Sequence, residues 1–443
     1  MAQEPESTAK RAELPMRLTR LRVKNFRSIA DIDIPLSPLT VLVGPNGSGK
    51  SNVVDALRFV RDVFARGLDQ AVMDREGMGV IQRWETEGIE IGLTLEITEI
   101  AEIREEGKVI RRAEPAASFD YDFSFSAAAF GGTIIHQEAV RIRTVGNPEV
   151  TIISSEELLA IVYGDMEWHY TVGVKSNGIS AFQSVEGPEG LLDKNENVFF
   201  DDEAWIEEYK KEEGYSWRRN RIAATRSEAA LREMLFYTLN PSDLRQPQQV
   251  LKETPLDEKG RNLAAVLRHL AKSGGPDWRS LRFALHQTVI GFHIYGVEAV
   301  GGYLATKLIY QGDDNKFRTS YIGQESDGTI RMLGLLAALL QQPSQPFICI
   351  EEPEANIHPG ALAVLAGVID EASLRSQILV TTHSPDMLDH LPVESFLVVE
   401  KVGDTTHVGP LDESQIASVR KRLFTPGELF RMEGLQRQAE SAS

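Results

Sequence analysis

The chain has 443 residues, 42% hydrophobic and 25% charged, with one cysteine and a formal net charge of −18. This composition is ordinary for a globular protein with two or three cores, and the negative charge excludes binding to nucleic acid by bulk attraction. The lone Cys349 excludes an internal disulfide, and no apolar stretch approaches the ~20 residues of a membrane span, so we expect a cytoplasmic protein without membrane contact.

The first part of the chain has the pattern of an α/β unit. Residues 1–15 are polar and predict a flexible tail. Residues 18–23 and the uncharged run at 39–43 predict two strands. A glycine-rich turn follows the second strand, and apolar residues at helical spacing then predict a helix over 51–65.

The next stretch changes to a period of two residues. Apolar and aromatic residues alternate with others over 89–97, 119–125 and 168–174, which predicts half-buried strands of an antiparallel sheet. Residues 190–237 are polar and predict helices, and from Thr329 helix and strand alternate. We therefore expect a tail at 1–15, a first lobe at 16–185, a helical insertion and linker at 186–275, a second lobe at 276–412, and a C-terminal helix and tail at 413–443.

A phosphate-binding loop follows the strand at 39–43. Its residues match the pattern G-x-x-x-x-G-K-[ST] in full: Gly44, Pro45, Asn46, Gly47, Ser48, Gly49, Lys50 and Ser51. Glycines let successive backbone N–H groups point at phosphate oxygens, and the following helix adds the positive end of its dipole. Lys50 would reach the β- and γ-phosphates of ATP, and the Ser51 hydroxyl would ligate Mg²⁺.

Two carboxylates close a second uncharged strand, and a histidine closes a third. Glu351 and Glu352 follow the apolar run FICI. Because adjacent strand residues face opposite sides, we expect Glu351 to hold Mg²⁺ and Glu352 to activate the attacking water. His383 ends a strand about thirty residues later, where it would bind the γ-phosphate or the attacking water.

A second anion-binding helix start is predicted far along the chain. Ser326, Asp327 and Gly328 precede a long apolar helix. Both helix starts of a single chain can bind the same ATP only if the fold brings them together. The simplest arrangement is a homodimer closed by ATP, in which two chains lie head to tail and each completes the other's site.

Five segments together resemble a known family. In order, LRVKNFRSI, VGPNGSGKSN, ESDGTIRMLGLLAALL, FICIEEPEANIHP and LVTTHSP are similar to motifs of the ABC-type ATPase heads of the RecF, chromosome-maintenance and OLD-nuclease group, and more closely to standalone AAA-family ATPases of bacteria. The resemblance implies an α/β P-loop NTPase fold of ABC type: a mixed central sheet with helices, an antiparallel β subdomain and a helical insertion.

The same resemblance implies roles for further residues. Arg27 and Ser28 would lie near the nucleotide, Asn52 would extend the phosphate loop, Asn240 would take the Q-loop position, and Asn356 and His358 would belong to the D-loop. The chain departs from the family pattern in two places. The signature reads SDG instead of SGG, and Glu351 stands where aspartate is usual.

These features predict an ATPase that acts as a nucleotide switch in DNA repair or antiphage defence. Work would be done by a separate effector or by bound DNA. A further departure from the OLD proteins is that too little chain follows Leu391 for a nuclease domain like theirs. One alternative is a regulatory ATPase that sequesters a toxin-like partner; another is an ABC transporter subunit, disfavoured by the SDG signature and the strand-rich insertion.

DNA contact would need a local basic patch, since the net charge is negative. Two clusters qualify, although solvated faces or ion pairs explain them at least as well. They are Arg218, Arg219, Arg221 and Arg226, and Arg17, Arg20, Arg22, Lys24 and Arg27.

Overall fold

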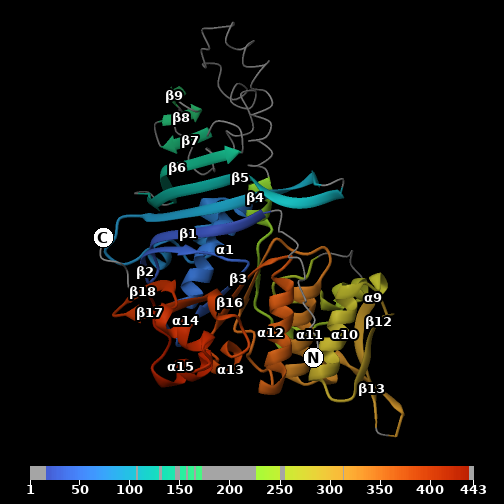
Figure 1. Cartoon of the computed structure of the whole chain (residues 1–443). Helices are drawn as coiled ribbons and strands as arrows, with labels where there is room; N and C mark the ends of the chain where they lie inside the picture. Colours follow the sequence, from blue (N-terminus) through green and yellow to red (C-terminus); the bar gives the residue numbers. More distant parts are fainter. Residues whose placement is uncertain are drawn as a thin grey trace.

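The computed structural model describes residues 16–105, 108–128, 132–144, 150–155, 158–163, 166–171, 226–249, 255–312 and 314–438. Its centre is a sheet of fourteen strands in the order β10-β15-β16-β3-β17-β18-β2-β1-β4-β5-β6-β7-β8-β9 (Figure 1). A smaller antiparallel sheet lies apart from it. The predicted α/β fold with a mixed central sheet is therefore confirmed.

One half of the large sheet is mainly parallel. β10, β15, β16, β3 and β17 pair in parallel with their neighbours, so their carboxyl ends meet at one edge. These strands are β10 (Leu235–Tyr237), β15 (Phe347–Glu351), β16 (Gln377–Thr382), β3 (Leu39–Val43) and β17 (Phe396–Val402). Ligands of open α/β sheets bind at the carboxyl ends of the strands, so a ligand is expected at this edge. The edge brings together chain segments about 300 residues apart.

The other half is antiparallel and continues the same sheet. β18 (Thr405–Pro410) pairs with β17 and joins it to β2, and from β1 onward neighbours run in opposite directions. The strands are β2 (Ile29–Pro35), β1 (Met16–Phe26), β4 (Ile89–Glu105), β5 (Lys108–Ala127), β6 (Thr133–Thr144), β7 (Val150–Ser155), β8 (Leu158–Tyr163) and β9 (Met166–Thr171). The alternating segments thus extend the central sheet, while Val172 and Val174 lie outside the described residues.

Helices cover the parallel strands on both faces. On β15, Phe347 and Cys349 belong to the core shared with α1 (Lys50–Arg66), whereas Ile348 and Ile350 belong to the opposite core. That second core holds α11 (Asp327–Leu340) and α12 (Pro359–Ala372), which lie beside each other. A strand buried on both faces has no room for charge until its end, which is why β15 is apolar up to Glu351.

The remaining elements are a small sheet and a set of shorter helices. The small sheet is β11 (Gln248–Gln249), β13 (Tyr303–Gln311), β12 (Phe292–Val300) and β14 (Phe317–Tyr321). The helices are α2 (Leu68–Met73), α3 (Met78–Ile81), α8 (Pro241–Leu244), α9 (Leu263–Ser273), α10 (Pro276–Thr288), α13 (Pro385–Leu388), α14 (Glu413–Arg420) and α15 (Pro426–Met432), with 3₁₀ turns at Ile322–Gln324 and Val393–Ser395.

One predicted helix is wrong at its end. Residues 226–232 are helical, but Leu235–Tyr237 form β10, while residues 190–225 lie outside the described residues. The side chains of Phe236 and Tyr237 are buried, and β10 pairs with β15. A partner strand that is distant in sequence therefore overrides the local helical pattern.

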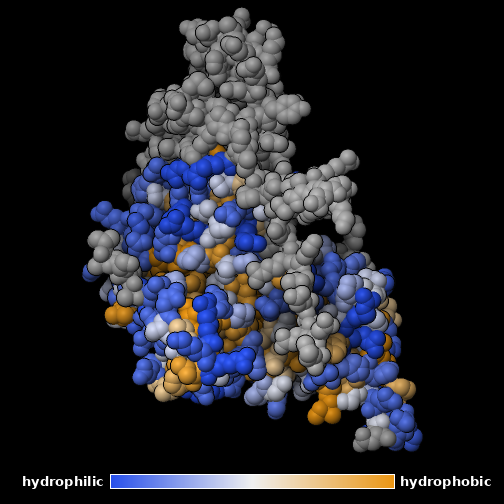
Figure 2. Space-filling view, viewed as in Figure 1, coloured by the Kyte–Doolittle hydropathy of each residue, from blue (hydrophilic) through white to orange (hydrophobic). Residues whose placement is uncertain are grey.

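The visible surface is mainly polar. Figure 2 shows hydrophilic residues over most of the lower half of the molecule, with small separate hydrophobic patches among them. Within the described part of the chain, no helix is both long and apolar enough to cross a membrane.

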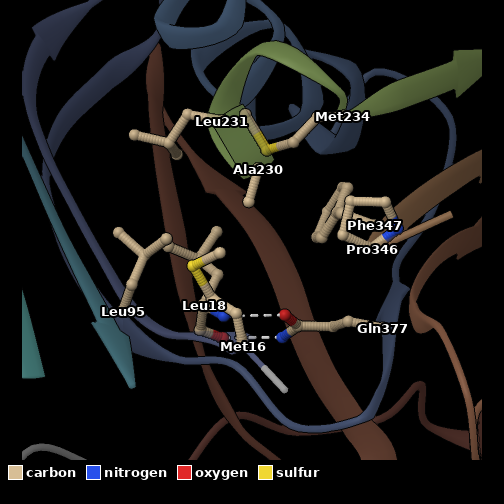
Figure 3. A pocket seen from close by; sticks show the side chains of 9 residues that line it. All are labelled: Met16, Leu18, Leu95, Ala230, Leu231, Met234, Pro346, Phe347 and Gln377. Atoms are coloured by element: carbon tan, nitrogen blue, oxygen red, sulfur yellow. Dashed lines mark hydrogen bonds between the residues drawn. The ribbon is translucent and has the colours of Figure 1, made fainter. Parts of the chain in front are cut away.

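A buried glutamine joins the N-terminal strand to the parallel half of the sheet. At the start of β16, Gln377 is 2% exposed; its Oε1 accepts from the Leu18 N–H at 2.8 Å and its Nε2 donates to the Leu18 carbonyl at 2.6 Å (Figure 3). The amide thus satisfies both backbone groups of a buried strand residue. It also borders a small cavity that is lined by Met16, Leu18, Leu95, Ala230, Leu231, Met234, Pro346, Phe347 and Gln377.

Replacing this amide should destabilise the fold. Gln377→Ala leaves the N–H and C=O of Leu18 unpaired and buried, which should cost about 2–4 kcal/mol. Gln345→Ala is the matched control, because buried Gln345 makes only a local bond to the Pro343 carbonyl. Thermal unfolding should show a clearly lower midpoint for Gln377→Ala than for the control, and equal midpoints would contradict this role.

Candidate nucleotide-binding site

The predicted phosphate loop lies between β3 and α1 at the carboxyl edge of the sheet. Residues 44–49 connect the two elements, and Gly49 precedes α1 with φ of 106°. A Cβ at Gly49 would lie 2.0 Å from Thr406 Oγ1, so both the backbone angle and the space require glycine. Thr406 also donates from Oγ1 to the Ser48 carbonyl at 3.0 Å, which ties the loop to β18.

Lys50 places a buried cation inside this loop. It is 6% exposed, and its Nζ donates to the carbonyls of Gly44 at 2.7 Å and Pro45 at 3.0 Å. Burial lowers the pKa of Lys50, and the charges of Glu352 and Glu354 act in the opposite direction. Two neutral carbonyls therefore hold the Lys50 amine. An anionic phosphate of a nucleotide can take their place as its hydrogen-bond partner.

The β1–β2 turn lies against the beginning of α1. Ser28 Oγ is 2.7 Å from Thr406 Oγ1 and accepts from Asn52 Nδ2 at 2.5 Å. Arg27, in the left-handed region with φ of 51°, pairs with Asp55 of α1 at 2.9 Å. The structure thus brings Arg27, Ser28 and Asn52 together at the start of α1, beside the exposed Ser51.

The two carboxylates after β15 point to different neighbours. Glu351 pairs with Arg58 of α1, with Oε1 3.1 Å from Nη2. Glu352 adopts φ of 47°, and its Oε1 lies 3.2 Å from His383 Nδ1. Parallel pairing of β15 with β16 matches Glu351 with Thr381, so His383 follows at the same edge.

A third carboxylate, that of Glu354, contacts the residues at the end of β16. Its Oε1 accepts from Thr382 Oγ1 at 2.6 Å and from the His383 N–H at 3.3 Å. It also lies 3.8 Å from His383 Nδ1. The sequence prediction omitted Glu354; the available signal was its spacing, two residues beyond Glu352.

The second predicted helix start lies on the α11 side. Ser326 caps α11 by accepting from the Thr329 N–H, and Asp327 pairs with Arg245 at 2.6 Å. A Cβ at Gly328 would lie 2.6 Å from the Asn356 carbonyl, so this glycine permits close contact with the turn after β15. Among the described residues, no hydrogen bond or ion pair joins Ser326–Gly328 to residues 44–51 of the same chain.

Arg331 links this helix start to the β15 edge. One turn into α11, it donates to the Glu352 carbonyl at 2.8 Å and to the Leu239 carbonyl. Leu239 and Asn240 lie between β10 and α8. Asn240, the predicted Q-loop residue, is exposed. Burial lowers the pKa of Arg331, while Glu354 and Glu352 counteract that effect. Sequence reasoning missed Arg331 because it lies inside an apolar helix where its partners could not be identified.

The basic clusters are placed differently. Arg20, Arg22, Lys24 and Arg27 all pair with carboxylates, which favours ion pairing over a free basic patch. Arg218, Arg219 and Arg221 lie outside the described residues.

Oxygen donors are available for a magnesium ion. Ser51 offers a hydroxyl and Glu351 a carboxylate, the donor types that Mg²⁺ prefers. Within the described ranges, no group of three His, Cys, Asp or Glu residues could hold a metal without a further ligand. This donor set fits an ion that is completed by phosphate oxygens and water, which is the usual arrangement for Mg²⁺ at a nucleotide.

The loop, the buried lysine and the acidic strand end define the class of P-loop nucleotide-binding proteins. The chain matches the family described as "AAA domain, putative AbiEii toxin, Type IV TA system" over residues 158–389, more than half its length. Residues 16–126 match an "AAA ATPase domain". The chain belongs to this AAA-domain family, and its ATPase domain is related to the OLD, RecF and SMC proteins.

Curated relatives match over parts of their length. The endonuclease GajA of Bacillus cereus is 21% identical over 92% of this chain and 63% of its own. The OLD nuclease of Thermus scotoductus is 58% identical over 43 residues, which is 10% of this chain and 8% of its own. RecF of Brucella abortus is 43% identical over 13% of this chain and 15% of its own. The chain thus spans less than two thirds of these relatives.

Solved structures also align with the chain. An SMC head bound to the C-terminal winged-helix domain of ScpA is 15% identical, covers 90% of this chain and 99% of its own, and has a TM-score of 0.48.

Lys50→Ala should remove nucleotide binding. The substitution deletes the cation that would face the β- and γ-phosphates, so we expect ATP affinity to fall at least about tenfold by calorimetry. Lys24→Ala is the control. Lys24 lies on β1, is exposed, and pairs with Asp31 of β2 and Glu90 of β4. If the Lys50 variant keeps the affinity of the control, this loop does not bind the nucleotide.

Proposed function

We propose that the chain binds and hydrolyses ATP, and that two copies close around the nucleotide and separate after hydrolysis. The observation that carries this proposal is the shared sheet edge. There the buried Lys50 lies within the electrostatic reach of Glu352, and Glu352 touches His383. A phosphate-binding cation, a carboxylate that can orient water and a histidine that can bind phosphate lie at one edge, and such groups can support phosphoryl transfer to water.

Each residue then has a defined task. Backbone N–H groups of residues 44–49 and Lys50 Nζ would bind the phosphates, and Glu352 would orient the attacking water and take its proton. Ser51 and Glu351 would hold Mg²⁺, which when bound supplies charge neutralisation at the β- and γ-phosphate oxygens. Arg58 would release the Glu351 carboxylate for this purpose.

The second subunit is proposed because, among the described residues, no hydrogen bond or ion pair joins the N-terminus of α11 to the phosphate loop of the same chain. Ser326 is exposed at the first turn, and Gly328 lets this turn lie against Asn356. A helix start attracts anions, and a head-to-tail pair would bring this exposed one to the γ-phosphate held by the other copy. Arg331 of each chain would then connect its α11 start, which contacts the nucleotide of the partner, to its own Glu352, which serves the nucleotide of its own chain.

The proposed work of the switch is carried out by a separate effector, with DNA as a partner. The names of the relatives given above refer to nucleases and to DNA replication and repair, which supports this choice. The toxin in the family description supports the alternative of a regulatory ATPase that sequesters a toxin-like protein. An ATPase rate that DNA leaves unchanged at low salt would favour this alternative.

The shared site is tested by mixing two inactive variants. Lys50→Ala should lose ATP binding, and Ser326→Arg should bind ATP but block closure by its bulk. Their heterodimer has one site with both changes and one intact site, so a 1:1 mixture should regain about a quarter of wild-type ATPase activity.

Two further variants complete this test. Ser326→Ala removes the cap without adding bulk and should still dimerise. Glu352→Gln should bind ATP and accumulate as a dimer in light scattering, because closure precedes water activation. A monomeric Glu352→Gln protein with bound ATP, together with no recovered activity on mixing, would contradict the shared site.

A further inference from the structure

The carboxylate of Glu354 is largely buried at the end of β16. Its side chain is 9% exposed, and Oε2 is buried without a hydrogen-bond partner among the described residues. A buried, unpaired carboxylate oxygen is unfavourable unless it serves another group. A glutamine could accept the same bonds from Thr382 and His383, so these bonds alone do not explain a carboxylate here.

The ring of His383 also lies beside this carboxylate. Nδ1 is shielded from solvent and lies between Glu352 Oε1 at 3.2 Å and Glu354 Oε1 at 3.8 Å. Neither contact is a hydrogen bond in this structure, but a ring nitrogen can bond to carboxylate oxygens only as a donor. The tautomer that carries its proton on Nδ1 would face the two carboxylates and leave Nε2 for a ligand at the sheet edge.

Glu354 fixes the backbone of this histidine as well as its ring. Oε1 accepts from the Thr382 hydroxyl and from the His383 N–H, which holds the last turn of chain after β16. Burial lowers the pKa of Lys50 and of Arg331, and the charges of Glu352 and Glu354 oppose this effect, so both cations lie within electrostatic range of the two carboxylates. Glu354 thus contacts Thr382 and His383 directly and lies within electrostatic range of Lys50 and Arg331.

We propose that Glu354 is a positioning residue for His383: it anchors the strand end, orients Nδ1–H toward the two carboxylates and aims Nε2 at the γ-phosphate and attacking water. This inference rests on the proposed function. Glu354 itself touches neither substrate nor metal in this arrangement, and its effect on hydrolysis passes through the histidine.

The kinetic test compares Glu354→Ala, His383→Ala and the double variant. Glu354→Ala should lower kcat about tenfold to a hundredfold, because misplacing a group by ~1 Å has that effect, while KM for ATP stays within about twofold. The double variant should be no slower than His383→Ala, since the two residues act as one unit. Effects that multiply, or a KM that rises in step with the fall in kcat, would overturn the proposal.

Two controls separate positioning from loss of structure. Glu354→Gln keeps the shape and the acceptor for Thr382 and His383, so it should melt like the wild type and recover part of the kcat lost in Glu354→Ala. Glu371→Ala, on the exposed side of α12, should leave kcat unchanged. A Glu354→Gln protein no faster than Glu354→Ala would show that the acceptor contacts do not position His383.

A spectroscopic measurement makes the inference independent of ATP hydrolysis. In protein with ¹⁵N-labelled imidazole rings, the His383 signals are assigned by their loss in His383→Ala. The wild type should show protonated Nδ1, and Glu354→Ala should shift the ring toward the other tautomer or a mixture. If the wild type fails to hydrolyse ATP, the proposed function fails, but an unchanged tautomer in Glu354→Ala would separately overturn this inference.

Discussion

The site depends on the parallel pairing of β3, β16 and β15. Each strand is fully or nearly fully buried, and the register sets Val43 beside Thr382 and Thr381 beside Glu351. Pairing therefore brings the phosphate loop, Glu352 and His383 to one edge, although the loop and Glu352 are about 300 residues apart. A shift by one residue would turn each of these side chains to the opposite face.

Two arginines, the partly buried Arg58 and the buried Arg331, connect this edge to the helices on both faces. Arg58 holds Glu351 from α1, and Arg331 holds the Glu352 carbonyl from α11. Because a buried charge needs its partners, movement of either helix changes what the arginine can reach. The arrangement gives a physical route by which a ligand at the start of α11 would alter the carboxylate that serves the other nucleotide.

Much of the edge was predictable from sequence because its elements are short and strongly patterned. The apolar run at 39–43 before the glycines, and the uncharged run FICI before Glu351, each admit one interpretation. The strand at Leu235–Tyr237 was not predictable, since its only reason to be extended is β15. The contacts of Glu354, Arg331 and Thr406 were hidden for the same reason: local pattern does not reveal a partner that is distant in sequence.

The central claim is that ATP lies between the loop of one copy and the α11 start of another. Asn46 and Ser326 are both exposed, and Cys349 is buried, so introduced cysteines can be joined selectively. In the Glu352→Gln background, a chain with Asn46→Cys and a size-tagged chain with Ser326→Cys would be mixed and treated with a short bifunctional maleimide. The account predicts a cross-link between the two different chains that forms with ATP and Mg²⁺ and not without them. The account would be contradicted if the yield of cross-linked product were the same with and without nucleotide. It would also be contradicted if Asn46→Cys chains were joined to each other instead.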